Sequence, residues 1–93
     1  MDTVAAQKVL NEWLMKLRAV PYRELVSRVD SVTTDEVARD SARSWQLEIQ
    51  VLWDDEPGGN VRVMVSVDDG GLRPFVPMTE SFVKSPSDKF VGE

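Results

Sequence analysis

Two acidic stretches contain the side chains of this sequence that are best suited to chemistry. The first is WDDEPGGN at residues 53–60, and the second is VSVDDGGLRPF at residues 65–75. Carboxylate oxygens are the ligands that Mg²⁺ and Ca²⁺ prefer, and an arginine beside them binds anions. One hypothesis is therefore a metal-assisted hydrolase or an anion-binding enzyme that uses Asp68, Asp69 and Arg73.

The competing interpretation is that both stretches are turns between strands. Glycine tolerates the positive φ angles of hairpin turns, and aspartate forms hydrogen bonds with turn amides. In the hairpin described below, Asp54 and Asp68 lie at opposite ends, more than about 20 Å apart at about 3.3 Å per strand residue, so they cannot share an ion. Neither stretch has the spacing of a calcium-binding loop. We therefore predict no catalytic, cofactor or metal site and no enzyme activity, and we interpret Arg73 as a weak cross-strand partner of Asp68.

Composition narrows the function classes further. Of the 93 residues, 42% are hydrophobic and 29% are charged, which is enough apolar surface for one folded domain over 1–93. The chain contains no cysteine and no histidine, which removes disulfides, Cys/His zinc sites and the usual general base for neutral pH. Eleven basic and sixteen acidic residues give a net charge of −5, which disfavours nucleic acid as a partner.

The N-terminal segment predicts neither export nor membrane insertion. Its sequence, MDTVAAQKVLNEW, lacks the basic start and the unbroken apolar run of a signal peptide. The sequence also has no run close to the roughly 18 apolar residues that a membrane span needs. We therefore expect a cytoplasmic protein with no membrane partner.

The first part of the chain has the periodicity of helices. Apolar residues recur at intervals of three and four, at Ala6, Leu10, Trp13, Leu14 and Leu17. This spacing predicts a helix over 3–19, which Pro21 ends because proline disfavours helical geometry at the residue before it. The segment 21–29 begins with that proline in a first-turn position and predicts a short second helix.

The rest of the chain has the patterns of β-strands. Valine and threonine predict an edge strand over 30–38, and apolar residues alternate with polar ones over 44–53 and 61–69. If Trp53 pairs with Val61, the alternating apolar residues of both strands fall on one face of the sheet. A slip of one residue would turn them to the other face, so the pattern fixes this register.

The last strand is expected over 72–83, at a sheet edge because Pro74 and Pro77 cannot donate to a ladder. The tail 84–93 is expected to be a loop, of which Phe90 and Val91 dock back on the domain. The predicted fold is α+β: the N-terminal helix and the short second helix pack on one face of a three- to four-stranded antiparallel β-meander.

A candidate partner surface lies on the outer face of the predicted sheet. Leu52, Met64 and Phe75 fall near one another across three strands, with Arg62 and Arg73 beside them. The alternative is that these are ordinary scattered surface hydrophobes, or that the tail with Phe90 covers them.

Three segments of the second half, WQLEIQVLWDD, VRVMVSVDDGGLRPF and MTESFVKSP, resemble a pattern of small uncharacterised bacterial proteins. In that group one strand ends in Trp-Asp-Asp and another in Asp-Asp-Gly-Gly. The resemblance implies a bacterial, cytoplasmic, stand-alone domain, and it assigns no functional residue.

Taken together, these features favour a small non-enzymatic module that binds another protein or a second copy of itself. The binding surface would be the outer sheet face or the open edge strand. A narrower hypothesis is an acidic inhibitor of the antitoxin or immunity type, which blocks a basic partner through Glu12, Glu36, Asp54, Asp55 and Glu56.

Overall fold

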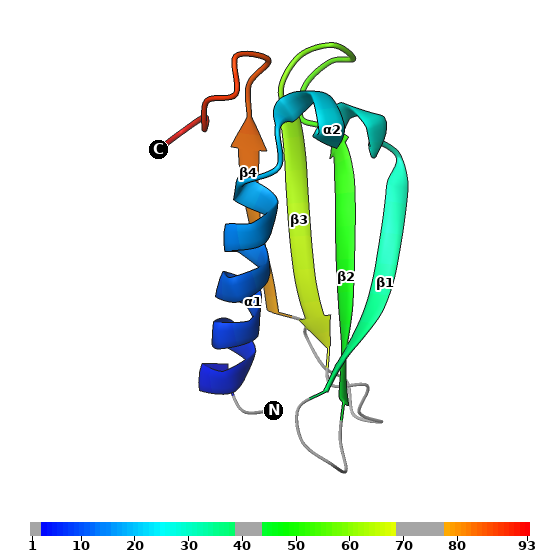
Figure 1. Ribbon diagram of the computed structural model, residues 1–93, viewed down its shortest axis with the longest axis vertical. Coiled ribbons are helices and arrows are strands. Elements are labelled where there is room, and N and C mark those ends of the chain that lie inside the picture. Colours follow the sequence, from blue (N-terminus) through cyan, green and yellow to red (C-terminus); the bar gives the residue numbers. More distant parts are fainter. Residues whose placement is uncertain (1–2, 39–43, 69–77) are drawn as a thin grey trace.

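The chain folds as two helices followed by a four-stranded sheet (Figure 1). The computed structural model describes residues 3–38, 44–68 and 78–93. The elements are α1 (Thr3–Arg18), α2 (Tyr22–Ser27), β1 (Ser31–Ala38), β2 (Ser44–Trp53), β3 (Val61–Asp68) and β4 (Met78–Lys84). All four strands are antiparallel, in the order β1-β2-β3-β4. The α+β meander predicted from the sequence is therefore confirmed.

The two helices form where the sequence predicts them, and each is slightly shorter. On α1 the predicted stripe faces the sheet, with Ala6, Leu10 and Leu17 buried. Pro21 precedes α2 in an extended conformation, with ψ of 150°. The chain leaves α2 through a turn in which Asp30 has a φ of 66°, and the Asp30 amide donates to the Val51 carbonyl at 2.9 Å. Neither described helix is long and apolar enough to cross a bilayer.

The hairpin of β2 and β3 has the register that the alternation predicts. Trp53 pairs with Val61, and the ladder continues to Leu47 opposite Val67. All four valines of β3, at 61, 63, 65 and 67, are completely buried, whereas the residues between them are half-buried. Because the side chains of a strand alternate between its faces, this burial pattern fixes the inner face of the sheet.

The register of the last hairpin corrects the sequence prediction. A pair between Asp68 and Arg73 would continue to Pro77 opposite Met64, but the observed partner of Met64 is Ser81. Val67 pairs with Met78, and β4 continues to Lys84. Proline and glycine are frequent between residues 70 and 77, so no alternation was present there to fix the pairing. Residues 69–77 themselves lie outside the described residues.

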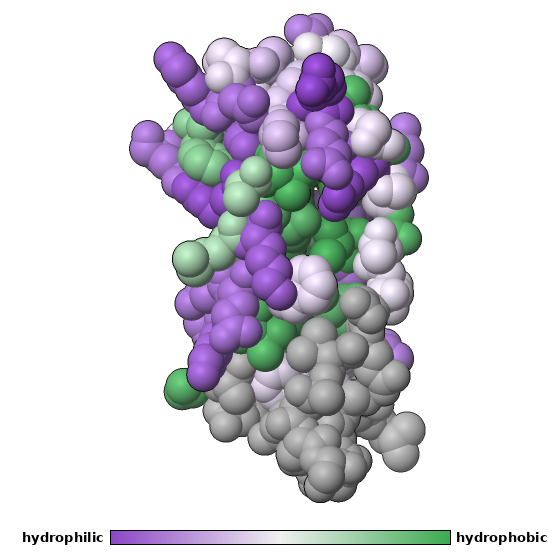
Figure 2. Space-filling view, in the orientation of Figure 1, coloured by the Kyte–Doolittle hydropathy of each residue, from purple (hydrophilic) through white to green (hydrophobic). Residues whose placement is uncertain are grey.

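The helices and the sheet form two layers around one core. Figure 1 shows α1 lying along β3 and β4, while α2 crosses one end of the sheet. In Figure 2, hydrophobic residues are visible between α1 and β1, below α2, because α1 does not extend over that side of the sheet. The buried core consists of Ala6, Leu10, Leu17, Leu25, Trp45, Leu47, Val51, Val61, Val63, Val65, Val67 and Phe82.

The tail after β4 docks on the domain, as Phe90 and Val91 predicted. Phe90 forms an isolated bridge with Lys84, and its ring contacts Phe82 edge-on with 5.8 Å between the ring centroids. The Val91 amide donates to the Val83 carbonyl at 2.9 Å. The tail therefore extends the core at the end where α1 stops.

Candidate functional site

The first acidic stretch forms the turn between β2 and β3. The Asp54 amide donates to the Asn60 carbonyl at 2.8 Å, and Gly58 has the positive φ, 85°, that such turns need. The Asp54 carboxylate pairs with Arg62 at 2.8 Å. Since one acid of this stretch is paired and the other two are exposed at the turn, the arrangement fits a structural turn.

The second acidic stretch is described only in part. Asp68 is the last residue of β3, where it pairs with Gln46, and so lies at the far end of the hairpin from Asp54. Asp69 and Arg73 lie outside the described residues. Within residues 3–38, 44–68 and 78–93, no group of three or more acidic, histidine or cysteine side chains is placed to hold a metal ion.

The outer sheet face brings together three of the five residues predicted as a partner surface. Leu52 is paired with Arg62, and Met64 follows on the same face of β3. All three are half-buried. The Arg62 guanidinium donates to the Asp54 carboxylate at 2.9 Å and to the Ser81 hydroxyl at 3.2 Å. Arg62 is therefore held within the fold, and Phe75 lies outside the described residues.

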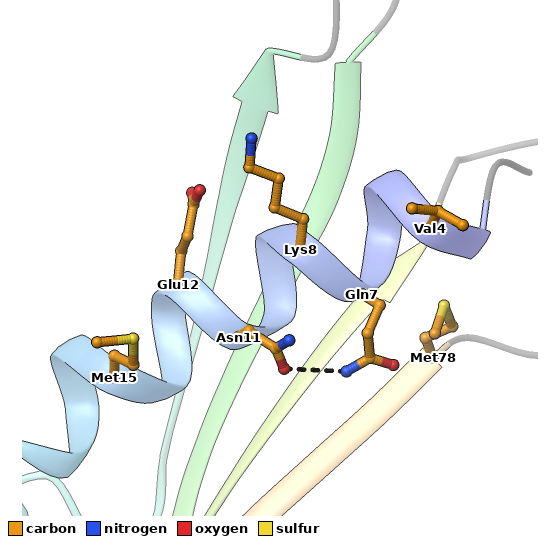
Figure 3. Close-up of a pocket in the computed structure, with 7 residues that line it drawn as sticks. All are labelled: Val4, Gln7, Lys8, Asn11, Glu12, Met15 and Met78. Carbon is orange, nitrogen blue, oxygen red and sulfur yellow. Dashed lines mark hydrogen bonds between the residues drawn. The ribbon is translucent and has the colours of Figure 1, made fainter.

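A more exposed apolar surface lies on α1. Val4 and Met15 retain 79% and 73% of their accessible surface, the largest values among the described large hydrophobic residues. They border an open groove of about 610 Å³ between α1 and the start of β4. Its lining is completed by Gln7, Lys8, Asn11, Glu12 and Met78 (Figure 3).

The polar residues of this groove are arranged in two rows. Figure 3 shows Lys8 and Glu12 projecting from one side of α1, and Gln7 and Asn11 projecting from the other side, toward Met78. The Gln7 side chain donates to the Asn11 carbonyl oxygen at 3.0 Å. We refer to the surface formed by these seven residues as the α1 groove.

The sequence prediction did not include the α1 groove, although one signal was present. Val4 and Met15 are eleven residues apart, which is about three helical turns, so they lie on one line along α1. This line is away from the buried stripe, where a surface helix normally carries polar residues. The contribution of Met78 could not be seen because it depends on the register of β4.

A buried lysine lies at the opposite end of α1. Lys84 is on the inner face of β4 and only 5% exposed. Its ammonium donates to the carbonyl oxygens of Arg18 and Val20 at 3.0 and 2.8 Å, and it pairs with Asp88 at 3.3 Å. The carbonyls at a helix C-terminus have no partner within the helix, and this end carries partial negative charge. Lys84 therefore satisfies the C-terminal end of α1.

Asp88 connects this lysine to the second helix. Its carboxylate accepts a hydrogen bond from the Tyr22 amide, at the start of α2, at 2.7 Å. This bond, together with the ion pair to Lys84, lowers the pKa of Asp88 below its ordinary value of 3.8. The Tyr22 hydroxyl in turn donates to the Gly59 carbonyl at 2.7 Å. These contacts thus join the end of α1, the start of α2, the turn between β2 and β3 and the turn after β4 that contains Asp88.

The final residues of the tail are held by Arg18. The Arg18 guanidinium donates to both carboxylate oxygens of Glu93, at 2.8 and 2.5 Å, and lies 3.8 Å from the centre of the Phe90 ring. This pairing lowers the pKa of Glu93 and raises that of Arg18. Because Arg18 and Glu93 are paired with each other and hold the end of the tail against α1, we interpret this ion pair as structural.

Comparison with family models, curated proteins and solved structures found no match to this chain. The fold and the sites described here define a small α+β domain with an exposed apolar groove on its first helix.

Proposed function

We propose that this chain is a small, non-enzymatic protein-interaction module whose binding surface is the α1 groove. The observation that carries this proposal is the exposure of Val4 and Met15 on the same line of α1. Burying apolar surface contributes about 25 cal/mol per Å² of favourable free energy. Contact of these two side chains with a partner is therefore favoured over their exposure to water.

The surroundings of these two residues also suit a binding surface. Protein interfaces have an apolar centre with polar groups at the rim that form hydrogen bonds. The α1 groove has Met78 beside the amides of Gln7 and Asn11 on one side and a lysine and a glutamate on the other. The half-buried Leu52 and Met64 of the outer sheet face offer less exposed apolar surface, so we favour α1.

The geometry gives less support to the other functions that the sequence suggests. An acidic inhibitor would need its carboxylates on one surface, but Asp55 and Glu56 lie at the turn beside Tyr22, whereas Glu12 lies on the α1 groove. Of the remaining proposed charges, Asp54 is paired with Arg62, and the side chain of Glu36 lies outside the described part. The metal-assisted hydrolase depends on two residues, Asp69 and Arg73, that also lie outside it.

The resemblance to small bacterial proteins leads us to propose a bacterial, cytoplasmic protein. Its net charge of −5 supports a protein partner over nucleic acid, since phosphate binding needs clustered Lys and Arg.

Affinity capture tests the proposed function. The purified chain is immobilised and exposed to extract of the cell that encodes it, beside the variants Met15→Glu and Val32→Glu. Both substitutions place the same charge at an exposed apolar residue, but Val32 lies on β1, away from the α1 groove. We expect Met15→Glu to lose the captured protein at least tenfold and Val32→Glu to retain it. Equal capture by both variants would contradict a binding role for the groove.

A further inference from the structure

Between Val4 and Met15 the exposed side of α1 is chemically symmetric along its length. At about 100° per residue, Val4 and Met15 lie about 20° apart, Lys8 and Glu12 lie to one side of them, and Gln7 and Asn11 lie to the other. The view in Figure 3 shows these two rows. This segment therefore has an apolar residue at each end, a row of opposite charges and a row of amides, and the exposed Lys16 continues the charged row beyond it.

The three pairs also share one centre. Val4 and Met15 are centred between residues 9 and 10, Lys8 and Glu12 at residue 10, and Gln7 and Asn11 at residue 9. These centres differ by one residue at most, which is about 1.5 Å along a helix. A twofold axis perpendicular to α1 near residues 9 and 10 would therefore place each member of a pair opposite the other member of that pair in a second copy.

Such an axis brings complementary groups together. When two copies of α1 face each other in antiparallel directions, each row meets the same row of the other copy in reverse order. Lys8 then meets Glu12 of the second copy, Glu12 meets Lys8, and each exposed apolar end meets the other type of apolar end. A parallel pair would place the charged row against the amide row, so the charges select the antiparallel arrangement.

We propose that the partner of the α1 groove is a second copy of this chain, docked through an antiparallel contact between the two α1 helices. An interface across a twofold axis requires a surface that is complementary to itself, and the exposed side of α1 meets this requirement. This inference rests on the proposed function and deepens it by naming the partner.

The size of the contact predicts a weak dimer. It involves the four turns of α1 and the adjacent Met78 on each copy, less than the surface that stable complexes bury. The two charge pairs lie at the surface, where salt screens them. We expect the average mass to rise from one chain toward two between about 10 µM and about 1 mM protein, and to rise less at high salt.

A charge-reversal experiment tests the proposal. Lys8→Glu places a second carboxylate opposite Glu12 of the other copy, and Glu12→Lys places a second ammonium opposite Lys8, so each variant alone should associate more weakly than the original chain. An equimolar mixture restores both opposite-charge pairs. We expect sedimentation equilibrium at about 50 mM salt to show association of the mixture, with at least a tenfold weaker tendency in either variant alone. Circular dichroism of each variant checks that it is folded.

Matched controls separate local pairing from overall charge. Lys89→Glu and Glu56→Lys make the same two charge changes at exposed residues outside the groove. These variants should dimerise like the original chain, whether alone or mixed.

Three results would overturn the proposal: a monomer at every concentration, a dimer that is unaffected by the reversals at Lys8 and Glu12, or a mixture that does not regain association. The proposed function fails separately. A strictly monomeric chain whose capture of a cellular protein is abolished by Met15→Glu would refute the second copy as partner and retain the groove as a binding surface. A chain for which Met15→Glu changes neither capture nor association would refute both.

Discussion

Lys84 has a structural role that its residue type does not suggest. A charged side chain on the inner face of a strand is costly unless hydrogen bonds replace its contacts with water. The carbonyls of Arg18 and Val20 provide these bonds, and Asp88 provides the opposite charge. The cost of burying lysine is thereby offset by satisfying a helix end that would otherwise be buried without donors.

Replacing this lysine should destabilise the domain. Lys84→Met keeps the length of the side chain but leaves the two carbonyl oxygens without their donor, so we expect the free energy of unfolding to fall by about 1–3 kcal/mol. Urea denaturation measures this change. Lys89→Met, at an exposed lysine of the same tail, is the control and should shift the midpoint very little. Equal midpoints for the two variants would contradict the role of Lys84.

The sheet depends most on β3, whose apolar face lies at the centre of the core. Val65 is completely buried and pairs with Ile49 on one side and Glu80 on the other. Val65→Asp should unfold the domain, because burying an unpaired carboxylate costs several kcal/mol, a large part of the stability of a small domain.

The same substitution on β1 provides the comparison. Val32 is 55% exposed, so Val32→Asp should leave a cooperative thermal transition within a few degrees of the original. Thermal melts followed by circular dichroism distinguish the two variants. A normal melt for Val65→Asp would mean that the observed register of the sheet is wrong.

The elements differed in how well their sequences predicted them. The alternation in β2 and β3 fixed their register, because any slip would expose the four valines of β3. The last strand could not be placed in this way. Its inner face consists of Met78, Glu80, Phe82 and Lys84, which includes two charged residues and therefore lacks a clear alternation. The buried position of Lys84 depends on the end of α1, a tertiary contact that no local pattern contains.

The candidate site was harder to predict for the same reason. Periodicity identifies the side of α1 that is buried, and the sequence places Val4 and Met15 elsewhere on the helix. A single exposed hydrophobic residue is ordinary. Only the folded molecule shows that the two border one groove together with Met78, which is 63 positions after Met15 in the chain.

On the scale of the whole molecule, the carboxyl groups of the tail should make the free energy of unfolding depend on pH in the acidic range. The amide of Tyr22 and the ammonium of Lys84 lower the pKa of Asp88 in the folded state, and Arg18 lowers that of Glu93. A carboxyl with a lowered pKa contributes stability that is fully present above its unfolded pKa. That stability is lost as the pH falls through the folded pKa.

Denaturation at a series of pH values tests this linkage. The contribution of these two carboxyls should be constant above about pH 6 and should begin to decline as the pH approaches their ordinary values of 3.8 and 4.5. Asp88→Asn should reduce this acid dependence, and asparagine tolerates the φ of 66° at this position. Glu56→Gln, at the exposed turn, is the matched control. An unchanged pH profile for Asp88→Asn would contradict the role of the carboxylate.

The contacts that secure the end of α1 also affect the order of events during synthesis. The hydrogen bonds from Lys84 to the carbonyls at the end of α1 and just after it join residues that are 66 and 64 positions apart, and the ion pair between Arg18 and Glu93 joins residues 75 positions apart. A ribosome releases the chain from its N-terminus, and distant contacts form only after the intervening chain is available. The C-terminal end of α1 must therefore wait until the whole sheet has been synthesised before Lys84 satisfies it.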